Sequence, residues 1–184
     1  MLSEVLQKYL KIFPDDIGQL GLLLDQIKKN EKLDDRRNFR GHIAGDAIIL
    51  SPDLKKILFI YHLRSKNWQQ PGGHWDKEEE GPWLTAKREA FEETGVKLGR
   101  HLNVSDDLRV PLQIITGPVY PSQAKKESHH WHHDFRYGFI AKTEELGSIQ
   151  DDGIGEAKWF PLDGIKTPGG HNIQIAIERL RTLI

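Results

Sequence analysis

Three carboxylates and one guanidinium lie close together in the run REAFEE at residues 88–93. In a helix, Glu89 lies one turn from both Glu92 and Glu93, so the three carboxylates share one face. Like charges at this spacing repel each other unless a cation lies among their oxygens. Because hard oxygen ligands favour Mg²⁺ or Mn²⁺ over softer metals, the spacing predicts a site for one of these ions.

A Pro-Gly-Gly sequence at residues 71–73 precedes this helix. Glycine lets another group approach the backbone closely, so a main-chain carbonyl at Gly73 could complete the shell of a metal. His74 follows directly. Its imidazole has two interpretations, a contact with metal-bound phosphates or an exposed loop side chain.

The stretch from Pro71 to Val96 resembles the Nudix box, G-x5-E-x7-R-E-U-x-E-E-x-G-U, in which U is a bulky aliphatic residue. It departs from that pattern at Ala90, which is small, and in the interval before Arg88, which is one residue too long. The isolated Glu of the pattern is therefore Glu79 or Glu80. We prefer Glu80, because the helix is rigid and the loop can absorb one residue. The matching residues are Gly73, Arg88, Glu89, Glu92, Glu93, Gly95 and Val96.

The resemblance implies an α/β (α+β) protein with a Nudix-like α/β/α sandwich and a mixed β-sheet. It implies a hydrolase in which water attacks a phosphorus of a diphosphate bridge, in a substrate of the nucleoside diphosphate-X type, with Mg²⁺ or Mn²⁺ as cofactor. Glu92 and Glu93 would bind the metal, and Glu89 would bind it or help to activate water. Arg88 would orient the cluster by pairing with the loop Glu.

Other readings of the same fold are weaker. A non-catalytic Nudix-like domain that binds a nucleotide as a sensor usually lacks the box glutamates, which are present here. The resemblance also admits isopentenyl diphosphate isomerase, an enzyme with the same fold. That enzyme uses a cysteine, and this chain has none.

A second unusual run, HHWHHD at residues 129–134, is rich in histidine. In a strand, His130, His132 and Arg136 would face one way, and His129 and His133 the other. The first face could line a substrate cleft, with His132 or His130 and Arg136 meeting phosphate. Solvated imidazoles on a strand edge, or an incidental metal site, fit equally well. A dedicated zinc site is disfavoured, because no third ligand at a suitable spacing is evident.

A basic pair, Arg64 and Lys66, precedes the Pro-Gly-Gly sequence and could meet substrate phosphates. Trp68 could stack on a base, but we favour a position in the core beneath the helix.

The elements that must position these residues follow from hydrophobic periodicity. Residues 1–40 read as an N-terminal helical segment with two short helices and a polar, solvated connection at 30–40; residues 41–184 read as the Nudix-like domain. Runs at 43–50 and 57–61 predict a β-hairpin, and strands are expected at 112–120, 131–141 and 156–160. A helix is expected over 82–94, closed by Gly95, and another at the C-terminus.

The composition limits which binding partners and metal ligands we expect for this protein. Lys and Arg (26) nearly balance Asp and Glu (27) over 184 residues, so no overall field favours nucleic acid or an anionic membrane. The absence of cysteine leaves His, Asp and Glu as the strong metal ligands. No signal peptide or membrane span is evident, so we expect a cytoplasmic protein with a nucleotide-type substrate. The N-terminal helices could form a homodimer contact or cover the cleft, and we favour the dimer.

Overall fold

The computed structural model describes residues 2–119, 121, 128–163 and 170–184, so Tyr120, the expected end of one strand, lies outside them. Four α-helices and one 3₁₀ helix are described: α1 (Leu2–Ile12), η1 (Pro14–Gln19), α2 (Gly21–Lys28), α3 (Pro82–Thr94) and α4 (Gly170–Arg181). The strands are β1 (His42–Leu50), β2 (Lys56–His62), β3 (Asn67–Gln69), β4 (Gly72–His74), β5 (Leu98–Leu102), β6 (Gln113–Val119), β7 (His130–Ala141) and β8 (Ile154–Pro161).

The strands form one mixed sheet with the order β3-β2-β1-β7-β5, while β4 also pairs with β1, β6 with β7 and β8 with β2. Among these pairs, β1 and β7 run parallel and the others antiparallel. The predicted hairpin of β1 and β2 and the mixed sheet are confirmed. The parallel pairing of β1 with β7 brings together segments that are far apart in the chain.

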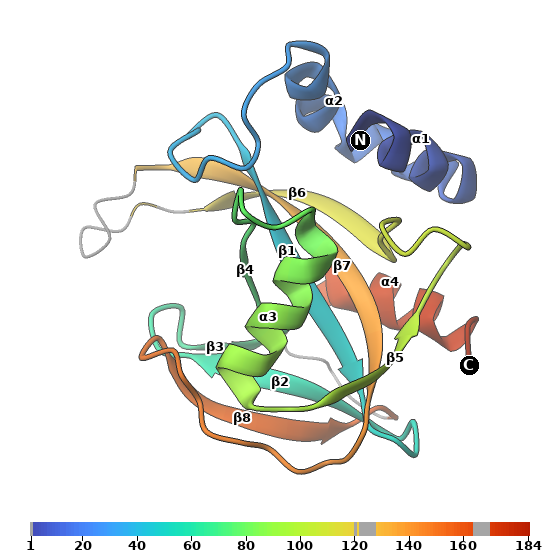
Figure 1. Cartoon of the computed structure of the whole chain (residues 1–184), viewed down its shortest axis with the longest axis vertical. Coiled ribbons are helices and arrows are strands. Elements are labelled where there is room, and N and C mark those ends of the chain that lie inside the picture. The colour runs from blue at the N-terminus through green and yellow to red at the C-terminus, as the bar shows by residue number, and fades with distance from the viewer. Residues whose placement is uncertain (1, 120, 122–127, 164–169) are drawn as a thin grey trace.

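The sheet is covered on both faces, because alternate residues of β1 point to opposite sides. Ile43 and Ala47 join the core cluster that contains Ala86 and Ala90 of α3, whereas Ile48 joins the cluster that contains the buried face of α4. Figure 1 shows α3 in front of β1 and β7, with α4 behind the sheet. The predicted α/β/α sandwich is therefore confirmed.

Helix α3 begins and ends where its sequence predicts. Pro82 stands in its first turn, and Gly95 closes it in the left-handed region with φ 64°. Gly45 of β1 faces the helix start, and a Cβ there would collide with the carbonyl oxygen of Pro82. The absence of a side chain at this position thus lets α3 lie directly on β1.

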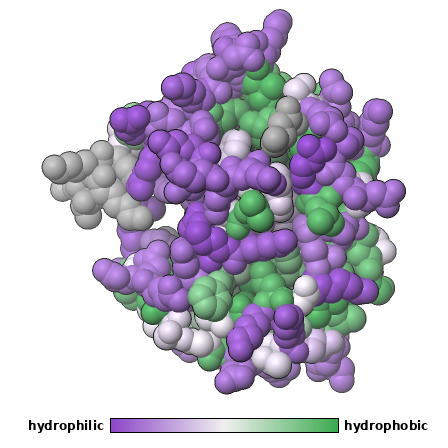
Figure 2. All heavy atoms as spheres, viewed as in Figure 1, coloured by the Kyte–Doolittle hydropathy of each residue, from purple (hydrophilic) through white to green (hydrophobic). Residues whose placement is uncertain are grey.

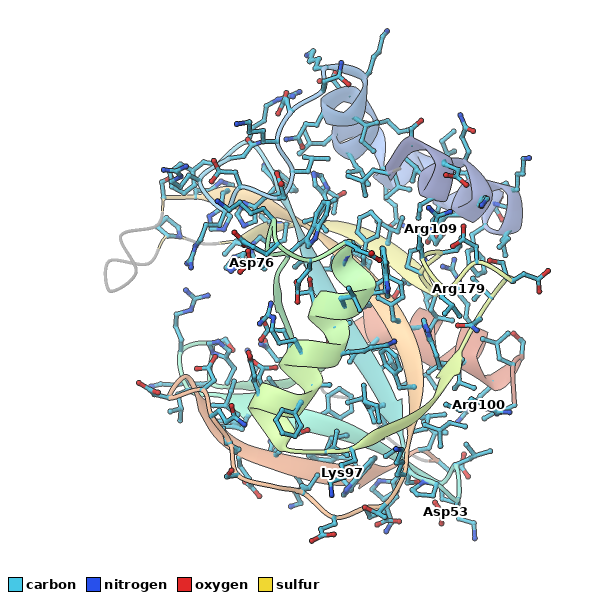
Figure 3. The ribbon with its side chains drawn as sticks, viewed as in Figure 1. Asp53, Asp76, Lys97, Arg100, Arg109 and Arg179 are labelled. Carbon is cyan, nitrogen blue, oxygen red and sulfur yellow. The ribbon has the colours of Figure 1, made fainter. Side chains whose placement is uncertain are left out.

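The N-terminal helices pack onto the same core as α3, with Leu6, Leu20 and Leu23 buried in it. Arg179 of α4 donates to Asp16 Oδ1 over 2.9 Å and to the Tyr9 hydroxyl over 3.1 Å. Figure 3 shows Arg179 on α4, the helix behind the sheet. These contacts tie α1 and η1 to the C-terminal helix.

The short strands β3, β4 and β5 were not predicted, since three to five residues give too little periodicity. No helix in the described part of the chain is long and apolar enough to cross a membrane. Hydrophilic residues dominate the face that carries α3, and apolar residues reach it in patches (Figure 2).

Candidate active site

Arg88 lies at the centre of the acidic face of α3. Its Nη1 donates to Glu89 Oε1 over 2.6 Å and to Glu92 Oε2 over 3.0 Å. Its Nη2 reaches the carbonyl oxygen of His74 over 3.3 Å. One guanidinium therefore holds two carboxylates of the helix and the backbone of β4 together.

The loop acid that pairs with Arg88 is Glu79, so our preference for Glu80 was wrong. Arg88 Nε donates to Glu79 Oε1 over 3.0 Å, and Thr85 Oγ1 donates to Glu79 Oε2 over 2.5 Å. Glu80 is exposed. The loop from Gly73 to Glu79 keeps the pattern length, and the extra residue is accommodated between Glu79 and the helix.

Glu93, which is buried, and Glu89, which is partly buried, lie against the two glycines of the Pro-Gly-Gly sequence. The backbone N–H of Gly72 donates to Glu93 Oε2 over 2.9 Å. A Cβ at Gly73 would collide with the Glu89 carboxylate. The glycines thus allow β4 to lie against the acidic face, as their sequence position suggested.

Burial works against the charge on both carboxylates. Burial raises the pKa of Glu93 to about 9, with the Gly72 N–H opposing the shift and nearby Glu89 and Asp151 adding to it. The pKa of Glu89 is also raised, first by burial, and Arg88 opposes that shift. A cation among these oxygens would offset the penalty.

Asp151 is a fourth acid of this region that the sequence did not reveal. It comes from the segment before β8, where the backbone N–H of Gln150 donates to the carbonyl oxygen of Glu92 over 2.7 Å. Its charge contributes to the raised pKa of Glu89 and Glu93. Because it lies far along the chain from the box, no local spacing could have indicated it.

A cleft of 780 Å³ opens beside the acidic face and carries Glu89, Glu92 and Arg88 on one wall. The polar connection before β1, which we interpreted as solvated, lines this cleft with Lys32, Asp34, Asp35, Arg36 and Arg37. Asp76, in the loop between β4 and α3, contributes to the rim (Figure 3). The cleft therefore has acidic and basic groups facing a common space.

The predicted substrate residues Arg64 and His74 lie in different places. His74 lines the 780 Å³ cleft together with the box residues. Arg64 lines a second cleft, of 570 Å³, which it shares with Glu92, Asp151 and Asp152. Glu92 borders both clefts, so the acidic face is accessible from two sides.

The histidine-rich strand β7 divides its side chains between two faces as predicted. His133 is buried, with Nδ1 2.8 Å from Thr116 Oγ1 and Nε2 2.8 Å from Gln26 Oε1 of α2. His132 lies on the other face, with its Nε2 3.2 Å from His74 Nε2. Burial, followed by the neighbouring imidazoles, lowers the pKa of His132 to about 2.

Arg136 lines neither of these two clefts, and its burial argues against its assignment as a phosphate partner. Its side chain is buried, with Nε 3.5 Å from Asp46 Oδ2 and Nη1 donating to Gln113 Oε1 over 3.1 Å. An internal pair of this kind neutralises the guanidinium within the fold. Trp68 is partly buried and packs against Phe160 with ring centroids 4.9 Å apart, in the core cluster that contains α4. The expectation that it lies beneath the box helix was therefore wrong, because the box helix α3 belongs to the other core cluster.

The acidic face has the composition that a hard divalent cation requires. Glu89, Glu92, Glu93 and Asp151 offer carboxylate oxygens, and the absence of a side chain at Gly73 leaves room for the Glu89 carboxylate beside the backbone. Arg88 opposes the raised pKa of Glu89, and the Gly72 N–H opposes that of Glu93, but burial outweighs both contacts. The residues present therefore fit Mg²⁺ or Mn²⁺.

Comparison with known proteins gives a consistent picture. The family model described as NUDIX domain matches residues 41–180. A NUDIX-family hydrolase from Clostridium perfringens shares 25% identity with a TM-score of 0.61, over 78% of this chain and 98% of that chain. A NUDIX hydrolase from Nitrosomonas europaea shares 21% identity with a TM-score of 0.52, over 76% of this chain and 88% of that one.

The NUDIX domain of Shewanella oneidensis NrtR, solved in complex with ADP ribose, shares 20% identity with a TM-score of 0.51, over 86% of this chain and 96% of that one. No curated protein matches the chain. Since the family model spans most of the sequence and includes the acidic cluster around Arg88, the chain belongs to the NUDIX family.

Proposed function

We propose that the protein hydrolyses the diphosphate bridge of a nucleoside diphosphate-X compound, with Mg²⁺ or Mn²⁺ held by Glu89, Glu92 and Glu93. The observation that carries this proposal is the cluster in which Arg88 contacts Glu79, Glu89 and Glu92 at the wall of the 780 Å³ cleft. A non-catalytic domain would have no need to keep this set of charges intact.

Basic side chains in the lining of the cleft support a polyanionic substrate. Lys32, Arg36 and Arg37 line the same cleft as the box residues, with Asp34 and Asp35 between them in the chain. Basic side chains there would attract a diphosphate and partly neutralise it. The net charge of the whole chain is −1, so this attraction has to be local.

The class of substrate is supported by one structural relative. The NUDIX domain from Shewanella oneidensis was solved with ADP ribose, which is a nucleoside diphosphate joined to a sugar. At 20% identity that likeness concerns the fold. We therefore propose the compound class, and ADP-ribose is the first member to test.

Each box residue has a defined part in the proposed reaction. A bound divalent ion would neutralise phosphate oxygens and lower the pKa of a water molecule. Arg88 keeps Glu89 and Glu92 oriented toward the cleft and is itself held by Glu79. The Gly72 N–H fixes one oxygen of Glu93. Positioning of this kind supplies much of the catalysis in phosphoryl chemistry.

The test is product release from a panel of nucleotide sugars, dinucleoside polyphosphates and oxidised nucleoside triphosphates, with Mg²⁺ or Mn²⁺. Hydrolysis of one class that stops in EDTA supports the proposal and identifies the substrate class. Tight nucleotide binding without any turnover would instead support the alternative, a sensor domain, and would contradict a hydrolase.

A further inference from the structure

Four histidine side chains from three strands meet beside the cleft: His42 of β1, His74 of β4, and His130 and His132 of β7. One ring nitrogen from each lies within 4.8 Å of those of the other three. The sheet register causes the meeting, since His42 is level with His132, and His74 with Ala44 two residues along β1. Residues level with each other, or two apart, point to the same face.

Two of the distances between ring nitrogens are short enough for the rings to share a cation. His132 Nε2 lies 3.2 Å from His74 Nε2 and 3.2 Å from His130 Nε2. Four nitrogens placed tetrahedrally at the usual zinc–nitrogen distance of about 2.0–2.1 Å would be about 3.4 Å from one another. These two separations are close to that value, and the other nitrogens, all within 4.8 Å of one another, would move closer together around an ion.

The outer nitrogens of two rings are bound to backbone carbonyl oxygens. His130 Nδ1 lies 2.7 Å from Ser128 O, and His42 Nδ1 lies 3.2 Å from Asn38 O. A carbonyl oxygen can only accept, so in the neutral rings Nδ1 carries the proton and Nε2 presents its lone pair. This second layer of contacts is the arrangement that orients histidine ligands of metals.

Hydrogen bonds among the rings cannot by themselves satisfy this geometry. His132 Nε2 has either one proton or one lone pair, yet it is equally close to His74 Nε2 and His130 Nε2. If His130 Nε2 presents a lone pair, the His132 proton can be directed at only one of these neighbours. A cation accepts all the lone pairs at once.

The chemistry of the cluster separates it from the acidic box. Imidazole is a ligand for zinc and other transition metals, whereas the carboxylates of the box suit Mg²⁺ or Mn²⁺. His42 and His130 are only 1% exposed, while His74 lines the 780 Å³ cleft and gives an ion access from solvent. Four protein ligands leave no open position, which is the pattern of structural zinc sites.

We propose that His42, His74, His130 and His132 bind one Zn²⁺ ion in a tetrahedral structural site that is separate from the catalytic metal site. The ion would join β4 to β1 and β7. Because the carbonyl oxygen of His74 accepts a hydrogen bond from Arg88 Nη2 over 3.3 Å, the site would also hold β4 against the box.

The experiment uses the full chain without an affinity tag, freed of metal by a chelator and then titrated with Zn²⁺ in competition with a chromophoric chelator. We expect one Zn²⁺ per chain in the wild type. His130→Gln and His132→Gln should each weaken binding at least 10- to 100-fold, the loss found even when partners of metal ligands are changed. His129→Gln is the matched control, since His129 directly precedes the same strand and is exposed, and this variant should bind as the wild type does.

Two further measurements keep the proposal testable if a histidine variant fails to fold. The wild type loaded with Co²⁺ should show the intense visible bands of a tetrahedral ion. Glu93→Gln should keep its Zn²⁺ stoichiometry, because Glu93 belongs to the box. Failure of the wild type to bind Zn²⁺, a six-coordinate Co²⁺ spectrum, or loss of Zn²⁺ in Glu93→Gln would each overturn the site, whatever the result for hydrolysis.

Discussion

The acidic box and the four-histidine cluster are neighbouring sites that the chain builds in opposite ways. The carboxylates Glu89, Glu92 and Glu93 lie on one helix, within five residues of sequence. The histidines come from β1, β4 and β7, between residues 42 and 132. His74 borders both sites, with its imidazole in the cluster and its carbonyl oxygen on Arg88.

This contrast shows which kind of site a sequence reveals. Helical spacing is fixed by local geometry, so three carboxylates at i, i+3 and i+4 must share a face. The histidine cluster depends on the parallel register of β1 with β7 and on a three-residue strand, neither of which has a local signature. Ligands on one helix can therefore be predicted from sequence spacing, whereas ligands brought together by a sheet cannot.

The variant with the largest expected effect changes the acidic box and leaves the histidine cluster intact. Glu93→Gln should lower kcat by at least about 100- to 1,000-fold, because a metal is worth several kcal/mol of transition-state stabilisation. The amide is close in shape to the acid, and burial already disfavours the charge on Glu93, so the thermal midpoint should change little. Steady-state kinetics with Mg²⁺ and a melting curve provide the check; activity equal to the wild type would refute the role of Glu93.

The next effect concerns the cluster. Zn²⁺ at 100 times its Kd should raise the free energy of unfolding of the metal-free protein by about 2.7 kcal/mol, since it binds the folded state. Urea unfolding with and without Zn²⁺ measures this difference. His130→Gln should lose the gain and His129→Gln should keep it; an equal gain in both variants would mean that Zn²⁺ binds elsewhere.

A matched pair of variants sharpens the comparison at the loop acid. Glu79→Gln should reduce kcat/KM by about 10- to 100-fold, because Glu79 holds Arg88, which orients two carboxylates of the box. Glu80→Gln should stay within about twofold, as expected for an exposed side chain without such a contact. If Glu80→Gln instead lost more activity than Glu79→Gln, Glu80 would be the loop acid of the box, as we first expected from the sequence.

The smallest effect concerns His101, a partly buried histidine that lies outside the cluster. His101 stacks on Phe139 and lies near Tyr137, and burial, followed by the charge of Lys87, lowers its pKa to about 4. Below about pH 6.5, His101 binds a proton in the unfolded chain but stays neutral in the folded chain. The free energy of unfolding therefore falls as the pH is lowered from 6.5 to 4.

His101→Phe removes this titration. Compared with the wild type, the variant should lose less stability when the pH is lowered from 7 to 4, as measured by urea unfolding at each pH. Identical pH profiles of the two proteins would show that His101 titrates normally in the folded state.

Much of the fold was predictable because the relevant signals are local. Pro82 and Gly95 bound the box helix, and the apolar runs of β1 and β2 indicated their hairpin. Helix α3 itself placed Arg88 among the carboxylates, as its spacing required.

The rest of the site depended on tertiary contacts. The box pattern could not decide between Glu79 and Glu80, because the position of the extra residue depends on how the loop packs on Thr85. Asp151 reaches the box from a distant segment. Arg136 had the charge of a phosphate ligand, but its buried pairing with Asp46 could not be read from the sequence.

The most direct test of hydrolysis at the box is the fate of the oxygen from water. Turnover of a nucleoside diphosphate-X substrate in H₂¹⁸O with Mg²⁺, followed by mass spectrometry of the products, should place one ¹⁸O on a phosphate group, because water attacks phosphorus. Label on a carbon-bound oxygen of a product, or no metal-dependent turnover across the substrate panel, would contradict the proposed function.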